Sequence, residues 1–414
     1  MSKTVLVIGG GAAGMMAAIT AAENGAAVTL LEPNERLGKK LNITGKGRCN
    51  VTNCANQEEL LAHVAKNGRF LYSAFSRFDG HDTMAFFEKL GVPLKVERGN
   101  RVFPVSDRSF DISGALERRM RTLGVKWVRD RALTLSFDGD GAVAGAVGEK
   151  EEYTAEAVII ATGGVSYPAT GSTGDGYRMA ADAGHTVVAP TASLVPLVSE
   201  DPACPAMQGL ALKNVRLSVR NQKKKVVFED FGELLFTHFG LSGPLILSAS
   251  AHMRDFGKNQ YTISIDLKPA LDEKKLESRI LRDMEDRKNQ NFTALLGGLV
   301  PHSMVPVVAD RCGISGDTKV HSVTREQRRK LETVLKQFEI SVIGTRSVTE
   351  AIVTSGGIKT GEINPNTMES KTVKGLYFAG EVIDTDAYTG GFNLQIAWAT
   401  GRAAGEAAAR NEND

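Results

Sequence analysis

The stretch between Lys3 and Glu32 constrains the fold of this 414-residue chain more than any other. It begins with a short apolar run rich in β-branched residues, Lys3-Thr-Val-Leu-Val-Ile8, which breaks at once into Gly9-Gly-Gly-Ala-Ala-Gly14. An Ala- and Met-rich helical pattern follows, and a second apolar run then ends in Glu32. A strand, a Gly-x-Gly-x-x-Gly turn, a helix, a strand and an acid in this order predict a βαβ unit that binds a dinucleotide.

Each glycine of that pattern, and the acid after it, has a physical role. Gly9 makes the tight turn, Gly11 lets the backbone approach a pyrophosphate, and Gly14 lets the helix and strand pack closely. The pyrophosphate then meets the free N–H groups at the start of the helix. Glu32 is placed to accept hydrogen bonds from a ribose diol. The alternative is a purely structural glycine turn, and the flanking elements together with the acid argue against it.

Composition limits the class of protein. A chain of this length is expected to form two or three domains, and its 42% of hydrophobic residues suffices for a large core. The net charge of +2 gives no electrostatic case for nucleic acid or an anionic membrane as a partner. No apolar run approaches the roughly 20 residues that cross a bilayer. Four cysteines in a chain of this length fit reduced thiols rather than a disulfide framework. Together with the absence of a membrane-spanning run, this predicts a cytoplasmic protein. We expect a small-molecule substrate and leave the oligomeric state open.

The pattern along the chain suggests a sheet domain interrupted by another domain. Helical periodicity covers 58–66, 82–90 and 113–123, a β-meander is expected over 125–137 and 142–153, and 157–164 reads as a buried parallel strand. Prolines at positions 190, 196, 202 and 205 indicate a linker. Beyond it, 215–229 and 261–267 alternate like antiparallel strands. Amphipathic helices are expected at 271–288 and 325–338, the second with an N-cap within 322–326.

Dinucleotide-like character returns late, with an apolar run over 375–382 and a glycine-led helix that starts near Asn393 and runs through 396–410. The acids Glu381 and Asp384 can hydrogen-bond ribityl hydroxyls, and the helix start can face the N1–C2=O edge of a reduced flavin. This favours FAD over free NAD and is typical of proteins of the glutathione reductase type. The alternatives are an ordinary turn acid for Asp384 and a helix-entry turn for Gly390-Gly391.

Several motifs resemble a known family. They are Lys40-Leu-Asn-Ile-Thr-Gly-Lys-Gly-Arg-Cys-Asn-Val-Thr-Asn53, Ser193-Leu-Val-Pro-Leu197, Leu235-Phe-Thr-His-Phe-Gly-Leu-Ser-Gly-Pro244, Thr354-Ser-Gly-Gly-Ile358, Glu362 through Lys371, and Gly380 through Gln395. The chain resembles the bacterial flavoproteins of the BaiN or aminoacetone-oxidase family, also called YhiN-type. The resemblance implies noncovalent FAD in a two-part Rossmann-like domain, with an inserted β-barrel-like domain that carries a helical subdomain.

We therefore predict an α/β fold with five segments. They are an FAD-binding domain over 1–189 and 358–414, an inserted β domain over 190–268 and 339–357, and a helical subdomain over 269–338. The residues expected to contact FAD are Gly9, Gly11, Ala12, Ala13, Gly14, Glu32, Lys40, Thr44, Gly47, Arg48, Cys49, Asn50, Ala132, Ala161, Thr162, Gly163, Gly380, Glu381, Asp384, Gly391, Asn393, Leu394 and Gln395.

Three residues are candidates for the chemistry itself. Arg48, with Lys46 beside it, lies in a glycine-rich loop and balances flavin or substrate charge, unless it only contacts phosphate or solvent. His238 is a proton donor or a hydrogen-bonded structural histidine, and Tyr388 is a proton donor or a ring packed beside the flavin. No metal site is predicted, because the seven histidines are scattered and none pairs with Cys or acids at ligand spacing.

Cys49 and Cys54 have the spacing of the redox pair of disulfide reductases. Cys54 lies outside the family motif, and no second strand–Gly-x-Gly-x-x-Gly–helix unit is visible for a separate NAD domain. The redox pair is therefore the less favoured reading, although the sequence leaves it open.

Members of the resembled family differ in reaction. One reduces C=C bonds of oxo-bile-acid intermediates with NADH, and another oxidises aminoacetone with oxygen. Our first hypothesis is an FAD-dependent reductase in which transient NAD(P)H reduces FAD and an unsaturated carbonyl compound, an enone of steroid or bile-acid type, takes the hydride. The alternatives are an oxidase of a small amine such as aminoacetone, and a non-catalytic FAD-binding redox sensor or scaffold.

Overall fold

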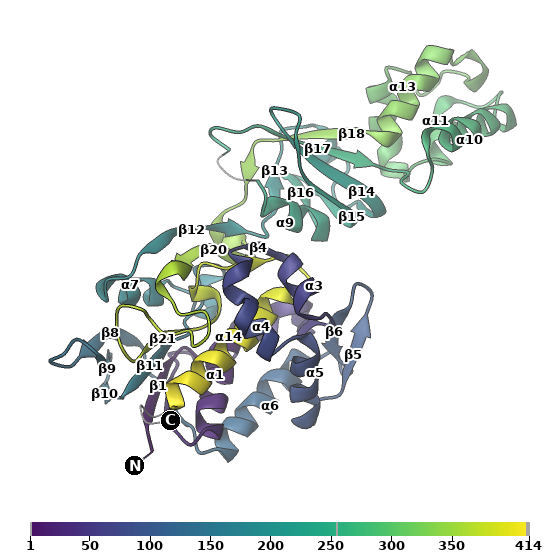
Figure 1. Cartoon of the computed structure of the whole chain (residues 1–414). Coiled ribbons are helices and arrows are strands. Elements are labelled where there is room, and N and C mark those ends of the chain that lie inside the picture. The colour runs from purple at the N-terminus through teal and green to yellow at the C-terminus, as the bar shows by residue number, and fades with distance from the viewer. Residues whose placement is uncertain (1, 254–255, 411–414) are drawn as a thin grey trace. The chain divides into compact units, whose positions relative to one another are not determined.

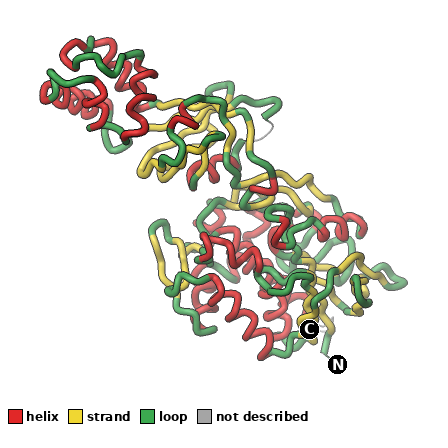
Figure 2. The backbone as a smooth tube through the Cα atoms, turned by 180° about the vertical axis from the view of Figure 1, so that it is seen from behind, coloured by secondary structure: helices red, strands yellow, loops and turns green. Residues whose placement is uncertain are grey.

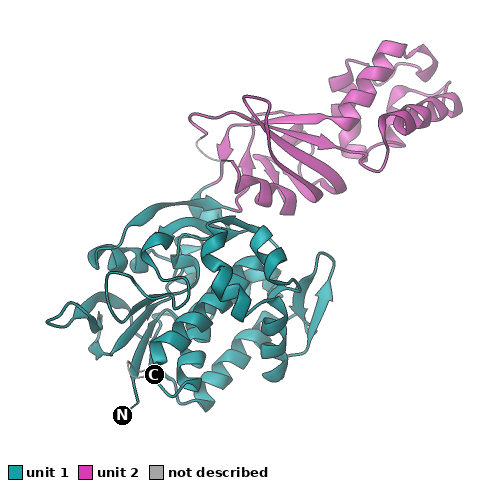
Figure 3. Ribbon diagram, viewed as in Figure 1, with its two compact units in different colours: residues 1–193, 347–414 teal, residues 194–346 magenta. Residues whose placement is uncertain are grey.

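The computed structural model describes residues 2–253 and 256–410. They divide into two compact units, each with its own hydrophobic core: unit 1 is Met1–Ser193 with Ser347–Asp414, and unit 2 is Leu194–Arg346 (Figure 3). Both ends of the chain therefore build unit 1. Among the described residues, no helix is long and apolar enough to cross a membrane.

A five-stranded parallel sheet forms the centre of unit 1. Its strand order is β21-β11-β1-β2-β7, so the late strand β21 pairs with β11 and completes the sheet that β1 begins. The apolar runs are continuous because this kind of sheet is covered on both faces. The sheet and the glycine turn after β1 confirm the predicted α/β, Rossmann-like fold. The strands are β1 (Thr4–Ile8), β2 (Ala27–Leu31), β7 (Lys126–Val128), β11 (Ala157–Ile160) and β21 (Leu376–Phe378).

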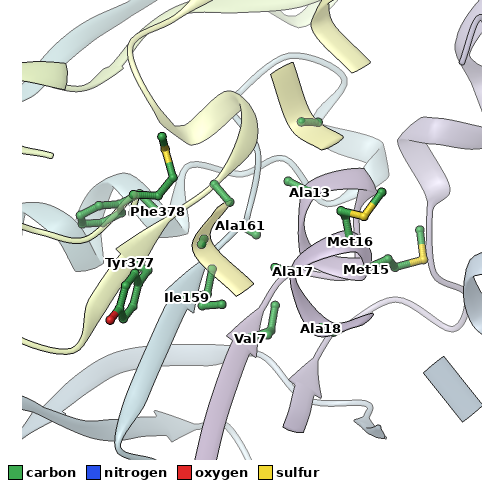
Figure 4. Close-up of a cluster of buried hydrophobic side chains, with 14 of the residues drawn as sticks. Val7, Ala13, Met15, Met16, Ala17, Ala18, Ile159, Ala161, Tyr377 and Phe378 are labelled. Atoms are coloured by element: carbon green, nitrogen blue, oxygen red, sulfur yellow. The ribbon is translucent and has the colours of Figure 1, made fainter. Parts of the chain in front are cut away.

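Two helices rich in small residues, α1 (Ala12–Glu23) and α14 (Phe392–Ala409), lie side by side (Figure 1). A Cβ atom added at Gly401 would lie 2.4 Å from the carbonyl oxygen of Ala13, and one at Gly405 would lie 2.4 Å from that of Ala17. Figure 4 shows Ala13 and Ala17 of α1 near Val7 of β1 and near the end of β11. The glycines of α14 thus allow this helix to approach α1 closely.

Smaller elements surround the sheet. A three-stranded antiparallel sheet contains β8, β9 and β10; β12 pairs with β20, and β22 pairs with β4. The remaining helices of unit 1 are α2 (Lys39–Ile43), α3 (Gln57–Ala62), α4 (Tyr72–Arg77), α5 (Gly80–Lys89), α6 (Ser109–Thr122) and α7 (Asp175–Asp182). The remaining strands are β3 (Thr52–Asn53), β4 (Val64–Lys66), β5 (Leu94–Glu97), β6 (Arg101–Pro104), β8 (Ala132–Phe137), β9 (Val143–Gly148), β10 (Glu152–Thr154), β12 (Val187–Ser193), β20 (Val353–Ile358) and β22 (Asp386–Ala387).

Local expectations needed correction in several places. The helix expected over 58–66 ends at Ala62, because the next residues form β4 and pair with β22, far along the chain. The antiparallel meander expected from residue 125 begins only at β8, because the residues before it form β7, which joins the parallel sheet beside β2. The linker expected near residue 190 is strand β12, and the run over 375–382 is a three-residue strand followed by a 3-10 turn. Tertiary pairing overrides local preference in these segments.

Unit 2 combines an antiparallel sheet with helices, several of which gather at one end of the unit, while α9 lies beside the sheet (Figure 1 and Figure 2). Its sheet order is β18-β17-β14-β15-β16-β13-β19. Thr324 caps α13 with a capping box, inside the N-cap region predicted from the sequence. The strands are β13 (Leu197–Val198), β14 (Ala211–Asn221), β15 (Val226–Thr237), β16 (Gly240–Ser242), β17 (Tyr261–Asp266), β18 (Phe338–Val342) and β19 (Gly344–Thr345). The helices are α8 (Ala203–Ala206), α9 (Pro244–Ser250), α10 (Glu273–Asp286), α11 (Phe292–Gly297), α12 (Val305–Cys312) and α13 (Arg325–Lys336).

Candidate functional site

The glycine turn between β1 and α1 leaves a space at the start of the helix. Gly9 has φ of +107°, and a Cβ there would lie 2.5 Å from the carbonyl oxygen of Ala161. At Gly14 a Cβ would lie 1.8 Å from the oxygen of Gly9, so both positions exclude a side chain. A Cβ at Gly11 would meet no atom within 4 Å. The open side at Gly11, next to the free N–H groups of α1, fits a pyrophosphate. Ala12 and Ala13 form the first turn of this helix.

Glu32 ends β2 beside the glycine turn. Its Oε2 accepts a hydrogen bond from the backbone N–H of Gly10 at 2.8 Å, and its Oε1 accepts from the N and Nδ2 of Asn34 at 2.9 and 2.7 Å. The side chain is 9% exposed. These bonds hold the carboxylate next to the cradle at Gly11, and its bond to a ribose remains a prediction.

The end of β11 forms the opposite wall. The backbone N–H of Ala161 donates to the oxygen of Ile8, and Gly163 takes φ of +74°. The Oγ1 atom of Thr162 is buried and has no hydrogen-bond partner among the described residues. This hydroxyl faces Gly176 of α7, where an added Cβ would lie 2.1 Å from Oγ1, so it does not mark the glycine cradle.

An ion pair joins the two parts of unit 1. Lys40 in α2 donates from Nζ to Glu381 Oε2 at 2.8 Å and to Ser166 Oγ at 2.7 Å. Glu381 Oε1 also accepts from the backbone N–H of Thr354 at 2.8 Å. Gly380, just before this acid, takes φ of +76°, and its Cβ would lie 2.7 Å from that of Ala13. The structure therefore brings two predicted FAD contacts, Lys40 and Glu381, together from positions 341 residues apart.

Asp384 has two partners that the sequence did not reveal. Its Oδ1 accepts from Lys66 Nζ at 2.6 Å, and its Oδ2 accepts from Asn67 Nδ2 at 3.1 Å. The Asp384 side chain is 5% exposed. Both partners follow or belong to β4, which lies beside the Asp384 loop because β4 pairs with β22. No sequence signal indicated these partners beyond the presence of Lys66 and Asn67 at the end of the segment 58–66, where the prediction of a helix throughout is wrong.

The start of α14 packs closely against the backbone of β3 and of the residues just before it. A Cβ at Gly391 would lie 2.3 Å from the backbone of Thr52. In the orientation that satisfies both ends of its amide, Asn50 accepts from the N–H of Gly391 at 3.0 Å. Asn393 bonds to the backbone of Ala387 through both ends of its amide. The N–H groups of the first turn, which includes Leu394, have no partner within the helix and suit an anionic edge.

Gln395 is fully buried one turn into α14. Its Oε1 accepts from the hydroxyls of Thr52 and Thr83 at 2.6 and 2.8 Å, and its Nε2 donates to the oxygen of Phe78 at 2.8 Å. Its amide therefore joins α14 to two neighbouring segments, and a direct FAD contact from it remains a prediction.

The loop after α2 carries Thr44, Gly47 and Cys49. Thr44 donates from Oγ1 to the oxygen of Leu41, and no atom lies within 4 Å of a Cβ built at Gly47. Cys49 is fully buried, and this burial raises the pKa of its thiol to about 12. Cys54 is partly exposed, with Sγ 3.8 Å from Nδ1 of His81, and both cysteines are free thiols. A high pKa at Cys49 disfavours the thiolate that a redox pair needs.

Arg48 is engaged by carboxylates. Its Nη2 lies 2.5 Å from Glu97 Oε1 and 2.6 Å from Asp107 Oδ1, and its guanidinium stacks over Phe103 at 4.1 Å. These two acids raise the pKa of Arg48 above its usual value. The structure thus shows Arg48 fixing its loop to the β5–β6 hairpin and the residues that follow it, while a role towards flavin or substrate stays a prediction.

The other two catalytic candidates lie in different units. Tyr388 in unit 1 is half-buried, and its ring meets that of His63 edge-on at 6.1 Å. His63 also stacks on Phe392, the first residue of α14, at 4.3 Å. His238 lies in unit 2, in the turn between β15 and β16, and its ring meets Phe239 edge-on. Of the remaining predicted contacts, Ala132 is the buried first residue of β8. The described residues hold no group of three or more potential metal ligands.

With an open glycine cradle at Gly11, Glu32 held beside it, and Glu381 held by Lys40, unit 1 fits FAD. The protein is an FAD-dependent oxidoreductase with a Rossmann-like domain of the glutathione reductase type. The chain belongs to the family described as HI0933-like protein Rossmann domain, whose sequence profile matches residues 3–407. This confirms the predicted family, which includes the BaiN and YhiN-type proteins.

Similar proteins cover nearly the whole chain. A 3-dehydro-bile acid Δ(4,6)-reductase of Clostridium scindens is 33% identical over 97% of this chain and 98% of its own length. A ribosomal RNA dihydrouridine synthase of Escherichia coli is 31% identical over 95% of both chains. Among solved structures, a 3-ketosteroid-Δ4-(5α)-dehydrogenase of Rhodococcus jostii RHA1 has a TM-score of 0.54 at 15% identity, covering 98% of this chain and 96% of that one. At that identity the structural likeness shows the fold alone.

Proposed function

We propose that the protein reduces a carbon–carbon double bond conjugated to a carbonyl group, with NAD(P)H as the electron donor and an enone of steroid or bile-acid type as the substrate. The observation that carries the proposal is the 33% identity to a bile-acid Δ(4,6)-reductase, which extends over 97% of the chain. FAD, when bound, supplies a carrier that takes up and releases a hydride.

The residues of unit 1 hold the cofactor and control its charge. Gly11 and the start of α1 receive the pyrophosphate, and Glu32 accepts from the ribose. Lys40 and Glu381 fix the middle of the cofactor, because their ion pair ties α2 to the segment after β21. The N-terminus of α14 favours negative charge on the nearby flavin edge.

Reduction of an enone also needs a proton at the carbon next to the carbonyl group. Tyr388 and His238 are the two candidate donors, and each has an ionisable group suited to general acid catalysis. Substitution with Phe and Asn respectively should separate them: loss of the donor lowers the rate of substrate reduction and leaves reduction of the flavin by NAD(P)H unchanged.

The test has two half-reactions. Oxidised holoenzyme is mixed anaerobically with NADH and NADPH, and the flavin absorbance near 450 nm is followed. We expect bleaching with at least one donor, followed by rapid reoxidation by a 4,6-unsaturated 3-oxo steroid. Absence of bleaching with both donors contradicts the proposal. Fast reoxidation by oxygen with peroxide release, together with reduction by aminoacetone, identifies an amine oxidase instead.

A second candidate substrate is uridine in ribosomal RNA. Its support is the 31% identity to a ribosomal RNA dihydrouridine synthase over 95% of the chain. The chemistry is related, because the C5=C6 bond of uracil is also conjugated to a carbonyl group. Incubating the reduced enzyme with ribosomal RNA and measuring dihydrouridine by mass spectrometry tests this candidate. If dihydrouridine forms, uridine in ribosomal RNA takes the place of the steroid-type enone as the proposed substrate, and the proposed hydride transfer from reduced FAD is unchanged.

A further inference from the structure

A dinucleotide electron donor needs a binding place of its own. The strand–glycine–helix unit at β1 and α1 is taken by FAD, and the sequence contains no second unit of this kind. The donor must therefore bind to a surface that does not follow the Rossmann pattern. The inference below rests on the proposed use of NAD(P)H.

Unit 1 has a solvent-open hollow beside α3 and α4. Leu61, Gly68, Arg69 and Tyr72 line it, and its volume is about 440 Å³. This is within the range of small-molecule sites, roughly 300–1,000 Å³. Gly68 and Arg69 belong to the short 3-10 turn that joins β4 to α4. The lining therefore combines an apolar floor with one cation.

Arg69 and Tyr72 carry unused binding groups. The Arg69 guanidinium takes part in none of the hydrogen bonds, ion pairs or ring contacts of the described residues; in this it differs from Arg48 and Arg119 of the same unit and resembles the exposed Arg118. Tyr72 is 62% exposed, which leaves most of its ring in water. A planar ring next to a free guanidinium suits a base that stacks and a phosphate that accepts hydrogen bonds.

The hollow is connected to the flavin end of the site by direct contacts. His63, two residues after Leu61, stacks on Phe392 at the start of α14, and its backbone oxygen accepts from the N–H of Tyr388 at 3.0 Å. Lys66 and Asn67, just before Gly68, bind Asp384. A ligand in the hollow therefore lies on the segment that borders the start of α14.

We propose that this hollow binds the adenosine diphosphate half of the NAD(P)H donor, with the adenine stacked on Tyr72 and the pyrophosphate held by Arg69. The nicotinamide half extends along the His63 side towards α14. Because the hollow is open to solvent, the donor can enter it and leave it without displacing FAD.

The proposal can be tested on holoenzyme saturated with FAD, so that ADP cannot enter the FAD site. Binding of ADP, NAD⁺ and NADP⁺ is measured by titration calorimetry, and reduction by NAD(P)H is measured by stopped flow. We expect Tyr72→Ala and Arg69→Gln each to raise the Kd for ADP about five- to a hundredfold. The limiting rate of reduction at saturating donor should stay the same.

Matched controls separate binding from folding. Tyr72→Phe keeps the ring and should bind within about twofold of the wild type. Arg118→Gln removes an exposed arginine of α6 that has no ion pair among the described residues, and it should change nothing. FAD content, thermal unfolding and photoreduction of the flavin should be equal in all four variants.

The outcomes decide between this inference and the function on which it rests. Unchanged ADP binding in Tyr72→Ala and Arg69→Gln overturns the site. If Tyr72→Ala and Arg69→Gln instead weaken binding of a short single-stranded RNA and leave ADP binding unchanged, the ADP site is also overturned. The hollow would then be a contact site for RNA. If ADP binding responds as expected while NAD(P)H fails to reduce the flavin, the ADP site stands and the proposed donor is wrong.

Discussion

Replacing Gly401 with alanine should destabilise unit 1, although the same change stabilises most helices. Alanine is favoured over glycine by about 1 kcal/mol in a helix interior. At Gly401, however, the new Cβ would lie 2.4 Å from the carbonyl oxygen of Ala13, about 1 Å inside ordinary contact. The obstacle is backbone, so α14 must move away from α1. Overpacking of this kind costs about 1–3 kcal/mol, which outweighs the gain in propensity.

The shift also affects the cofactor, because Ala13 lies in the first turn of α1. After the gain in propensity is subtracted, we expect Gly401→Ala to lower the stability of unit 1 by up to about 2 kcal/mol and to weaken FAD binding about tenfold. Gly405→Ala, whose Cβ would lie 2.4 Å from the oxygen of Ala17, should cost a similar stability but disturb FAD less.

Urea unfolding of the FAD-free protein, followed by tryptophan fluorescence, is the assay. Both tryptophans, Trp127 and Trp398, belong to unit 1, so the signal reports this unit. The matched control is Gly114→Ala in α6, where the Cβ meets only the guanidinium of Arg118 at 3.4 Å. It should stabilise by up to about 1 kcal/mol. If Gly401→Ala is as stable as Gly114→Ala, the close approach of α14 to α1 does not limit packing, and the reasoning is refuted.

Three further predictions follow from individual side chains. Lys40→Met should weaken FAD binding about tenfold in a fluorescence titration, because Glu381 loses its charged partner, whereas Lys40→Arg should retain most of the affinity. Iodoacetamide at pH 8 should label Cys54 before Cys49 in native protein, since burial raises the pKa of Cys49 to about 12; mass spectrometry showing the reverse order contradicts this. Burial lowers the pKa of His185 below its usual 6.5, so the unfolded state binds more protons and unit 1 should lose stability as the pH falls below about 6.5. His185→Gln should flatten that dependence in urea unfolding measured from pH 7.5 to 5.5, and an equal slope in both proteins would exclude His185 as its source.

Much of the geometry of the candidate FAD site was predictable because its physics is local. The turn at Gly9, Gly11 and Gly14 needs glycine for reasons that involve neighbours a few residues away. Glu32 ends the second strand of the same unit, so its position follows from the length of a βαβ unit. The helix start near Asn393 was visible for the same reason, since Gly390-Gly391 precedes it directly.

The partners of the late acids were not predictable because they come from distant segments. Lys66 and Asn67 reach Asp384 across more than 300 positions, and the contact depends on the pairing of β4 with β22. Periodicity favoured a helix through Lys66, which would have hidden that pairing. For Gln395 a signal existed: a single amide on the buried, Ala-rich face of a helix needs buried partners, and the structure supplies the hydroxyls of Thr52 and Thr83.

The two ends of the chain make the cofactor site inseparable from the fold of unit 1. Gly380 and Gly401 approach Ala13 from different elements of the C-terminal segment, and Lys40 holds Glu381 from the N-terminal one. The C-terminal segment therefore packs directly on the first turn of α1, which follows the cradle at Gly11. Joining these remote segments costs conformational entropy, because the loop that their contacts close contains all of unit 2. In the proposed function FAD contacts both segments, so its binding would stabilise the closed unit by the free energy of that binding. A chain cut before Phe392 should thus lose FAD even though its glycine motif is intact.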